Sequence, residues 1–211
     1  SMFVRDYMTT SPVTVTPEDS LGEALRLMKE HSIRRLPVMA KGKIAGLVTE
    51  QDLMKASPSS ATSLSIWEIN YLFPKIKIKD IMTKEIFTVT PETILEEAAL
   101  LMQENQISTL PVLDGDKLVG IITESDIFKA FIDVLGLNHP SMRVTLQVDD
   151  QIGVLKNVFE IVSAVGINVI STIVQRLPDQ KVHLILRLST GDIEKVTEIF
   201  ESAAMKVVHI C

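Results

Sequence analysis

An internal repeat is the feature that most limits how this chain can fold. Residues 8–52 contain, in order, a Thr-Val-Thr-Pro-Glu segment, a Leu-Pro-Val segment and a Gly-x-x-Thr-x-x-Asp segment. Residues 82–126 contain the same three segments, and every landmark is displaced by the same 74 residues without a gap. Self-similarity at one fixed offset indicates a duplicated structural unit. Because two copies of a small unit usually pair about a pseudo-twofold axis, the repeat predicts a cleft with two related sites.

Both copies show the same predicted order of elements at their start. A short strand, Val13–Val15 or Ile86–Val89, leads into a Thr-Pro-Glu turn, and a helix follows, from Ser20 to about Glu30 in the first copy. Apolar residues recur in these helices at the spacing of one helix face. They are Leu21, Ala24, Leu25 and Met28 in the first copy and Ile94, Ala98, Leu101 and Met102 in the second.

A strand pair and a second helix complete each copy. Residues 36–39 and 43–48 are predicted strands joined by a tight turn, and Asp114-Gly115 is the matching hairpin signal in the second copy. The second helix begins at Thr49 or Thr123.

The segment between the copies, residues 57–79, holds a third kind of pattern. Residues 64–73 are predicted to form an amphipathic helix that carries Trp67 and Tyr71 and ends at Pro74. A helix that packs the two copies together is the favoured interpretation, and a docking face for a partner is the alternative.

The pattern changes after the second copy. A Gly-Leu-Asn-His-Pro segment at 136–140 indicates a domain boundary. Beyond it, four strands (143–148, 169–175, 182–188 and 206–210) and two helices (150–164 and 192–203) are predicted. Their order is the βαββαβ pattern of ferredoxin-like folds. The whole chain is therefore predicted to be an α+β protein.

Composition and charge exclude several classes of protein. The chain of 211 residues is 46% hydrophobic, which is ample for packed cores. A net charge of −6 argues against a general nucleic-acid binder. No apolar run reaches the ~20 residues that cross a bilayer, and no signal peptide is recognisable, so no membrane association is predicted. Cys211 is the only cysteine, which fits the reducing cytoplasm, the predicted location.

The residues of common catalytic centres are not recognisable. There is no phosphate-binding Walker loop and no dinucleotide glycine fingerprint. The four histidines lack the spacing of metal ligands. We therefore predict a protein that is not an enzyme, with no catalytic residue, no metal site and no catalytic cofactor.

The two copies together resemble a tandem pair of CBS domains. The resemblance covers about residues 3–133 and rests on Gly-x-x-Thr-x-x-Asp behind Leu-Pro-Val, found twice at one offset. It implies CBS repeats at 3–56 and 80–133, packed as a pseudo-symmetric pair, and a regulatory adenine nucleotide in the central cleft. The implied nucleotide-binding residues are Val13, Val15, Arg34, Arg35, Leu36, Pro37, Thr49, Asp52, Ile86, Thr88, Leu110, Pro111, Thr123 and Asp126.

The residue types suit such a ligand. A helix that opens at Thr49 offers unpaired backbone N–H groups and a positive dipole end to phosphate. The Asp52 carboxylate can accept two hydrogen bonds from ribose hydroxyls. Aliphatic walls suit adenine, and we expect Val13, Val15 and Leu36 in the first copy and Ile86, Val89 and Leu110 in the second. The alternative is that Thr-x-x-Asp only caps the helix.

The two sites are predicted to differ. The first copy has Arg34 and Arg35 where the second has Ser108 and Thr109, and arginine is a strong phosphate ligand. Residues 1–56 carry eight Lys and Arg against seven acids, whereas 80–131 carry three against ten. We expect phosphate groups to prefer the first copy's site. The second site would hold a nucleoside-like or cationic adenosyl ligand, or nothing, and the alternative is that both arginines are ordinary surface charges.

Residues 143–211 resemble an ACT domain, a βαββαβ module. Asp150-x-x-Gly-Val-Leu and Gly166-Ile-Asn-Val carry the resemblance, although Ile152 stands where the family often has proline. The resemblance implies an amino acid or other small effector at a dimer interface, held by Asp150, Gly153, Val154 and Asn168. A plain assembly domain is the alternative.

A CBS pair followed by an ACT domain resembles the acetoin-utilisation regulatory proteins of bacteria. That resemblance implies a role in acetoin or carbon catabolism. The expected protein is a homodimeric sensor that binds an adenine nucleotide. The alternative is a ligand-free assembly module that dimerises and docks a partner enzyme, and a nucleotide hydrolase is a third hypothesis.

Overall fold

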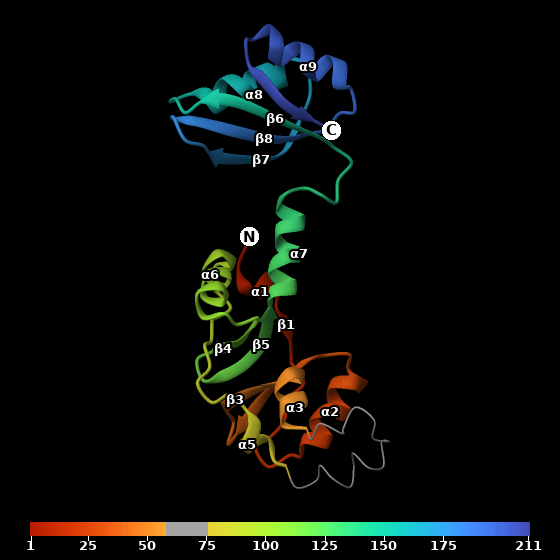
Figure 1. Ribbon diagram of the computed structural model, residues 1–211, viewed down its shortest axis with the longest axis vertical. Helices are drawn as coiled ribbons and strands as arrows, with labels where there is room; N and C mark the ends of the chain where they lie inside the picture. The colour runs from red at the N-terminus through yellow and green to blue at the C-terminus, as the bar shows by residue number, and fades with distance from the viewer. Residues whose placement is uncertain (58–75) are drawn as a thin grey trace. The chain divides into compact units, whose positions relative to one another are not determined.

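In the computed structural model, which describes residues 1–57 and 76–211, the chain divides into two units, Ser1–Ile127 and Phe128–Cys211 (Figure 1). The first unit holds both sequence copies. Its elements are α1 (Val4–Tyr7), β1 (Thr9–Thr10), α2 (Leu21–Glu30), β2 (Arg35–Ala40), β3 (Lys43–Thr49), α3 (Glu50–Ala56), α5 (Ile78–Ile81), α6 (Leu95–Asn105), β4 (Thr109–Asp114), β5 (Lys117–Thr123) and the start of α7 (Glu124–Val134). The helix predicted over 64–73, with Trp67 and Tyr71, lies outside the described residues.

Each copy is built on one antiparallel hairpin. Strand β2 pairs with β3, and β4 pairs with β5 in the equivalent register, so the predicted strand pairs are confirmed. The earlier strand prediction is wrong in both copies. Only Val15 and Val89 form a bridge there, each parallel to the hairpin of its own copy, at Val38 and Val112. The remaining residues of these stretches belong to no strand.

The N-terminal segment of each copy crosses to the other copy. Strand β1 adds to the second copy's sheet, giving the order β1-β5-β4, with Thr9 opposite Ile121. The Val4 amide donates to the Thr93 carbonyl at 2.8 Å, and Val4 is fully buried. In the equivalent contact of the other copy, the Ile78 amide donates to the Asp19 carbonyl at 2.9 Å. The short helices α1 and α5, which the sequence did not predict, therefore complete the core of the opposite copy.

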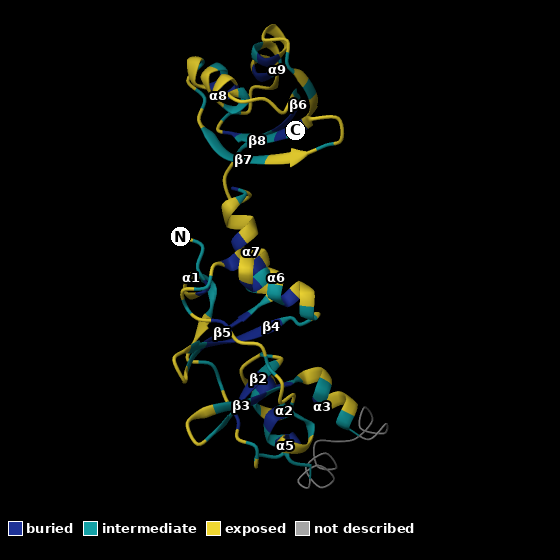
Figure 2. Ribbon diagram, turned by 90° about the vertical axis from the view of Figure 1, so that its left-hand side faces the viewer, coloured by how far each residue is buried: buried dark blue, intermediate teal, exposed yellow. Residues whose placement is uncertain are grey.

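The helix faces agree closely with the apolar spacing. In α2, Leu21, Ala24 and Met28 are buried in the first copy's core together with Ile78 of α5. In α6 the prediction was wrong at Ile94, which is 40% exposed because it is the residue that precedes the helix. Leu95 is buried in its place. Figure 2 shows the buried residues concentrated on β4 and β5 in this part of the molecule.

The second unit has the predicted βαββαβ order. It consists of β6 (Met142–Asp149), α8 (Val154–Ala164), β7 (Val169–Arg176), β8 (Lys181–Leu188), α9 (Ile193–Ser202) and β9 (Lys206–Ile210). The antiparallel sheet has the order β7-β8-β6-β9, and both helices lie on one face of it (Figure 1). Phe200, Val158 and Leu186 are among the fully buried residues of its own core. Helix α8 begins four residues later than predicted, because Gly153 precedes it at φ +88°.

The described residues contain no helix that is both long and apolar enough to cross a membrane.

Candidate functional site

The Thr-x-x-Asp segments cap the helices that follow the hairpins. The Thr49 amide donates to Asp52 Oδ2 at 2.9 Å, and the Asp52 amide donates to Thr49 Oγ1 at 3.2 Å. In the second copy the Thr123 amide and hydroxyl donate to Asp126 Oδ2 at 2.9 and 3.1 Å. The first copy therefore has a reciprocal capping box, and the second has only the half in which the aspartate accepts from the threonine. The cap uses only one carboxylate oxygen, and Oδ1 of each aspartate accepts no hydrogen bond from the described residues.

The helix starts keep different numbers of unpaired amides. In α3 the Glu50 amide donates to the Arg34 carbonyl, and the Asp52 amide donates to the cap. Of the first three amides of this helix, only that of Gln51 has no acceptor among the described residues. The Glu124 amide donates to the Ser108 carbonyl in the same way. Among the described contacts, the amides of Ser125 and Asp126 then have no acceptor. The start of α7 is therefore the better anion-binding end of the two.

A cavity of about 530 Å³ lies at the start of α7 and brings residues of both copies together. We call it the arginine cleft. From the first copy it receives the segments 9–13 and 31–35, and from the second it receives Ile121, Thr123, Ser125 and Asp126. Its volume falls within the range of small-molecule sites, roughly 300–1,000 Å³.

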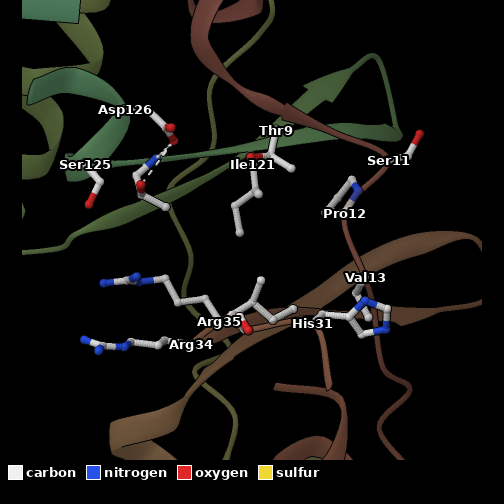
Figure 3. Close-up of a pocket in the computed structure, with 13 residues that line it drawn as sticks. Thr9, Ser11, Pro12, Val13, His31, Arg34, Arg35, Ile121, Ser125 and Asp126 are labelled. Atoms are coloured by element: carbon white, nitrogen blue, oxygen red, sulfur yellow. Dashed lines mark hydrogen bonds between the residues drawn. The ribbon is translucent and has the colours of Figure 1, made fainter. Parts of the chain in front are cut away.

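The arginine cleft has a charged end and an apolar end. In Figure 3, the side chains of Arg34 and Arg35 run side by side toward the end where Asp126 and Ser125 lie. Pro12 and Val13 lie toward the opposite end, close to His31, and Ile121 lies between the two ends. A flat apolar group fits the second end, and an anion with neighbouring hydroxyl groups fits the first.

The two arginines are held differently. Arg34 is mostly exposed, and its Nε lies 3.7 Å from a Glu50 carboxylate oxygen. Arg35 is half-buried, and its Nη2 donates to Ser108 Oγ at 2.9 Å. Its Nε is buried and has no hydrogen-bond partner among the described residues.

A second cavity of about 250 Å³ lies at the start of α3. We call it the acidic cleft. Thr49 and Asp52 of the first copy meet residues of the second copy there, among them Thr83, Ile86 and Ser108. It is lined by the carboxylates of Asp52 and Glu85, and no Lys, Arg or His is among the described residues that line it.

Comparison with known proteins decides the family of the chain. The model of the CBS domain family matches residues 4–59 and 78–133, which together exceed half of the chain. The chain belongs to the CBS domain family. Its first unit is thus a CBS pair, and both clefts lie within that pair.

Curated relatives of the CBS pair differ in length. The chain is 38% identical over 129 residues, 61% of its length, to the inosine-5′-monophosphate dehydrogenase of Korarchaeum cryptofilum, but spans only 23% of that enzyme. It is 31% identical over 124 residues to the CBS domain-containing protein YhcV of Bacillus subtilis. That match covers 59% of this chain and 81% of YhcV.

Solved structures match the same share of the chain. AcuB of Vibrio cholerae, a protein assigned to acetoin utilization, is 33% identical with a TM-score of 0.53, covering 65% of this chain and 98% of that one. The CBS pair of MJ0100, in complex with 5′-methylthioadenosine and S-adenosyl-L-methionine, is 30% identical with a TM-score of 0.51, covering 61% and 94%. CBSX2 in complex with AMP is 30% identical with a TM-score of 0.52, covering 64% and 98%.

The crossing of the CBS repeats corrects the predicted grouping of site residues. Arg34, Arg35 and Val13 were expected beside Asp52, but they lie with Thr123 and Asp126. The acidic cleft correspondingly joins Thr49 and Asp52 to Ile86 and Pro111. The reason is that the N-terminal segment of each repeat pairs with the sheet of the other repeat. This pairing places the start of α3 and the start of α7 opposite residues of the other repeat.

Some predicted site residues line neither cleft. Val15, Leu36 and Leu110 are buried in the repeat cores, and Val89 is as well. Pro37 is also buried, and Thr88 is exposed outside the acidic cleft. Strand alternation explains Leu36, because its neighbour Arg35 takes the cleft side of β2. Sequence reasoning missed Pro12, Ile121 and Ser125. Ile121 and Ser125 had a signal, since both lie inside the second Gly-x-x-Thr-x-x-Asp segment.

The C-terminal unit has a hollow of its own at the start of α8. Asp150, Gly153 and Val154 line this cavity of about 300 Å³, together with Arg176, whose Nε lies 3.6 Å from an Asp150 carboxylate oxygen. The fourth residue expected there, Asn168, does not reach it. Its backbone instead pairs with Ser189 at the beginning of β7.

Proposed function

We propose that the protein is a non-enzymatic regulator whose CBS pair binds an adenine nucleotide in the arginine cleft. The observation that carries this proposal is the meeting of Arg34 and Arg35 with Asp126 in one cavity of nucleotide size. CBSX2, a relative of similar fold, is described in complex with AMP, which supports the same ligand class here.

Each part of an AMP-like ligand has a counterpart in the cleft. Oδ1 of Asp126 can accept hydrogen bonds from the vicinal ribose hydroxyls, since the cap occupies only Oδ2. The guanidinium groups and the unpaired amides at the start of α7 suit phosphate. Ile121, Val13 and Pro12 offer apolar walls for adenine.

Isothermal titration with AMP, ADP, ATP and S-adenosylmethionine tests the proposal. Asp126→Asn keeps an oxygen for the helix cap but cannot accept from both ribose hydroxyls, so we expect AMP affinity to fall at least tenfold, as for loss of a charged hydrogen-bond acceptor. Asp52→Asn is the matched control, with the same change in the acidic cleft, and should leave that affinity unchanged. Equal affinity for AMP in the wild type and Asp126→Asn would refute the site.

The acidic cleft favours a different ligand of the same class. Its carboxylates repel a phosphate, so we propose a neutral or cationic adenosyl compound for it. The MJ0100 CBS pair, in complex with 5′-methylthioadenosine and S-adenosylmethionine, supports this choice. Binding of either compound that is lost in Asp52→Asn and retained in Asp126→Asn would establish it.

For the C-terminal unit we propose an ACT-type domain that binds a small effector or assembles a homodimer. The hollow lined by Asp150, Gly153 and Val154 supports an effector such as an amino acid, and titration of amino acids with Asp150→Ala tests it. The likeness to AcuB supports a role in acetoin or carbon catabolism. The location we propose is the cytoplasm.

An assembly module that docks a partner enzyme is the second candidate function. The observation in its favour is an apolar face on α7, where Phe128, Phe131 and Ile132 are 65%, 45% and 41% exposed at helical spacing. The same face supports a homodimer. Light scattering of the wild type and Phe128→Ser tests dimerisation, and failure of every nucleotide to bind would favour assembly over sensing.

A further inference from the structure

Arg35 lines the arginine cleft and is hydrogen-bonded to a residue that lines the acidic cleft. Its side chain lines the arginine cleft, and Nη2 donates to Ser108 Oγ at 2.9 Å. Ser108 lines the acidic cleft. One partly buried hydrogen bond therefore joins the two sites.

The guanidinium has binding capacity that the described residues do not use. Arg35 Nε is buried and donates to no described acceptor, and a buried unpaired donor is costly. In Figure 3, Arg35 runs alongside Arg34 to the end of the cleft that Asp126 shares. An anion there can accept from the guanidinium, and arginine is a preferred ligand of phosphate.

The hydrogen bond between Arg35 and Ser108 has no counterpart at the equivalent positions of the two repeats. The offset of 74 residues makes Thr109 the counterpart of Arg35, and Ser108 the counterpart of Arg34. Thr109 cannot reach across as an arginine does, and its buried Oγ1 has no partner among the described residues. Any coupling carried by Arg35 therefore involves an anion in the arginine cleft.

We propose that Arg35 exchanges Ser108 for the anionic group of the ligand and so couples the two clefts. This inference rests on the proposed nucleotide function of the arginine cleft. When phosphate takes Nη2, the Ser108 hydroxyl is released toward the acidic cleft and loses its contact with the guanidinium. The coupling is reciprocal, so whatever holds Ser108 in the acidic cleft changes the affinity for phosphate by the same factor.

AMP titration of Ser108→Ala tests the exchange. Because Ser108 competes with phosphate for Nη2, we expect its removal to tighten AMP binding about three- to tenfold, the value of one such hydrogen bond. Ser108→Thr keeps the hydroxyl and should bind AMP as the wild type does. Thr83→Ala is the control for a change in the acidic cleft that does not touch Arg35, and should have no effect. Circular dichroism checks that each variant is folded.

A double-mutant cycle shows whether Ser108 acts through Arg35. In an Arg35→Ala background, the Ser108→Ala change should leave AMP affinity unaltered. If AMP binding depends on Asp126 but Ser108→Ala alone leaves it unchanged or weaker, the exchange is overturned and the proposed function still holds. Absence of AMP binding by the wild type would overturn both.

Discussion

The glycine of each Gly-x-x-Thr-x-x-Asp segment lies where the backbone of the other CBS repeat approaches closely. A Cβ atom at Gly120 would lie 2.9 Å from the Thr9 carbonyl oxygen and 2.6 Å from the Met8 sulfur. At Gly46 the corresponding distances are 2.6 Å to the Thr83 carbonyl oxygen and 2.9 Å to the Met82 sulfur. A methionine side chain can move, but a backbone carbonyl in a sheet cannot, so the contact requires a residue without a side chain.

Gly120→Ala should therefore destabilise the CBS pair by about 1–3 kcal/mol, the usual cost of overpacking. Denaturant unfolding measures this free energy. Gly22→Ala in α2 is the matched control, because its nearest neighbour lies 3.8 Å away and alanine favours a helix by up to ~1 kcal/mol. Equal stability of the two variants would contradict the close-approach argument.

Single residues also mark the limit of the sequence argument. Arg34, Arg35 and the two aspartates could be proposed as ligands from chemistry alone, since guanidinium and carboxylate groups have strong preferences. The sequence could not predict which arginine lies beside which aspartate, because that depends on a contact between segments more than 70 residues apart. Arg35 and Asp126 share a cleft only through the folded pair.

At the scale of elements, the sequence predicted the helix starts and hairpins that neighbouring residues determine. The starts of α2, α3 and α9 were predicted to within one residue, because Ser20, Thr49 and Asp192 cap them directly. The hairpins followed from strand patterns and turn residues. Helices α1 and α5 were missed because each spans a single turn and is stabilised by packing against the other repeat, for which neither segment has a pattern of its own.

The turns of the two hairpins are joined by an ion pair between Lys43 Nζ and Asp116 Oδ2 at 2.7 Å. The hydrogen bond and charge of Lys43 lower the pKa of Asp116, and Asp116 raises the pKa of Lys43. A carboxylate whose pKa is lowered by folding stabilises the protein above its ordinary pKa. That contribution is lost as the pH falls through the lowered value.

We therefore expect Asp116→Asn to lower the thermal midpoint slightly at pH 7. The effect should vanish as the pH falls through the lowered pKa of Asp116, because the wild-type carboxylate is then protonated as well. The difference at pH 7 should shrink in high salt, because the pair is exposed. Asp114→Asn, in the same turn, has no ion pair among the described residues and serves as the control. A difference that grows toward low pH would refute the assignment.

At the scale of the whole molecule, the two units have separate cores. The CBS pair is built around two hairpins, and the C-terminal unit around one four-stranded sheet with two helices. The Gly and Pro residues of 136–140 predict a boundary there, whereas the structure divides earlier, between Ile127 and Phe128.

Separate cores predict separate responses to ligand. We expect calorimetry to resolve two unfolding transitions, and AMP at a hundred times its Kd should stabilise one of them by about 2.7 kcal/mol. Asp126→Asn should remove that shift and leave the other transition unchanged. A single transition that moves as a whole with AMP would show that the units unfold together.

The crossing of α1 and α5 separates the unit of duplication from the unit of folding. Residues 1–10 complete the second repeat, and residues 76–83 complete the first. A fragment cut between the repeats would contain an entire sequence copy and yet lack the segment that closes its core. Removal of the first ten residues would damage the second repeat and the start of α7, more than a hundred positions away in the chain. Engineered fusions and truncations of this protein should therefore be planned on the exchanged boundaries and not on the repeat.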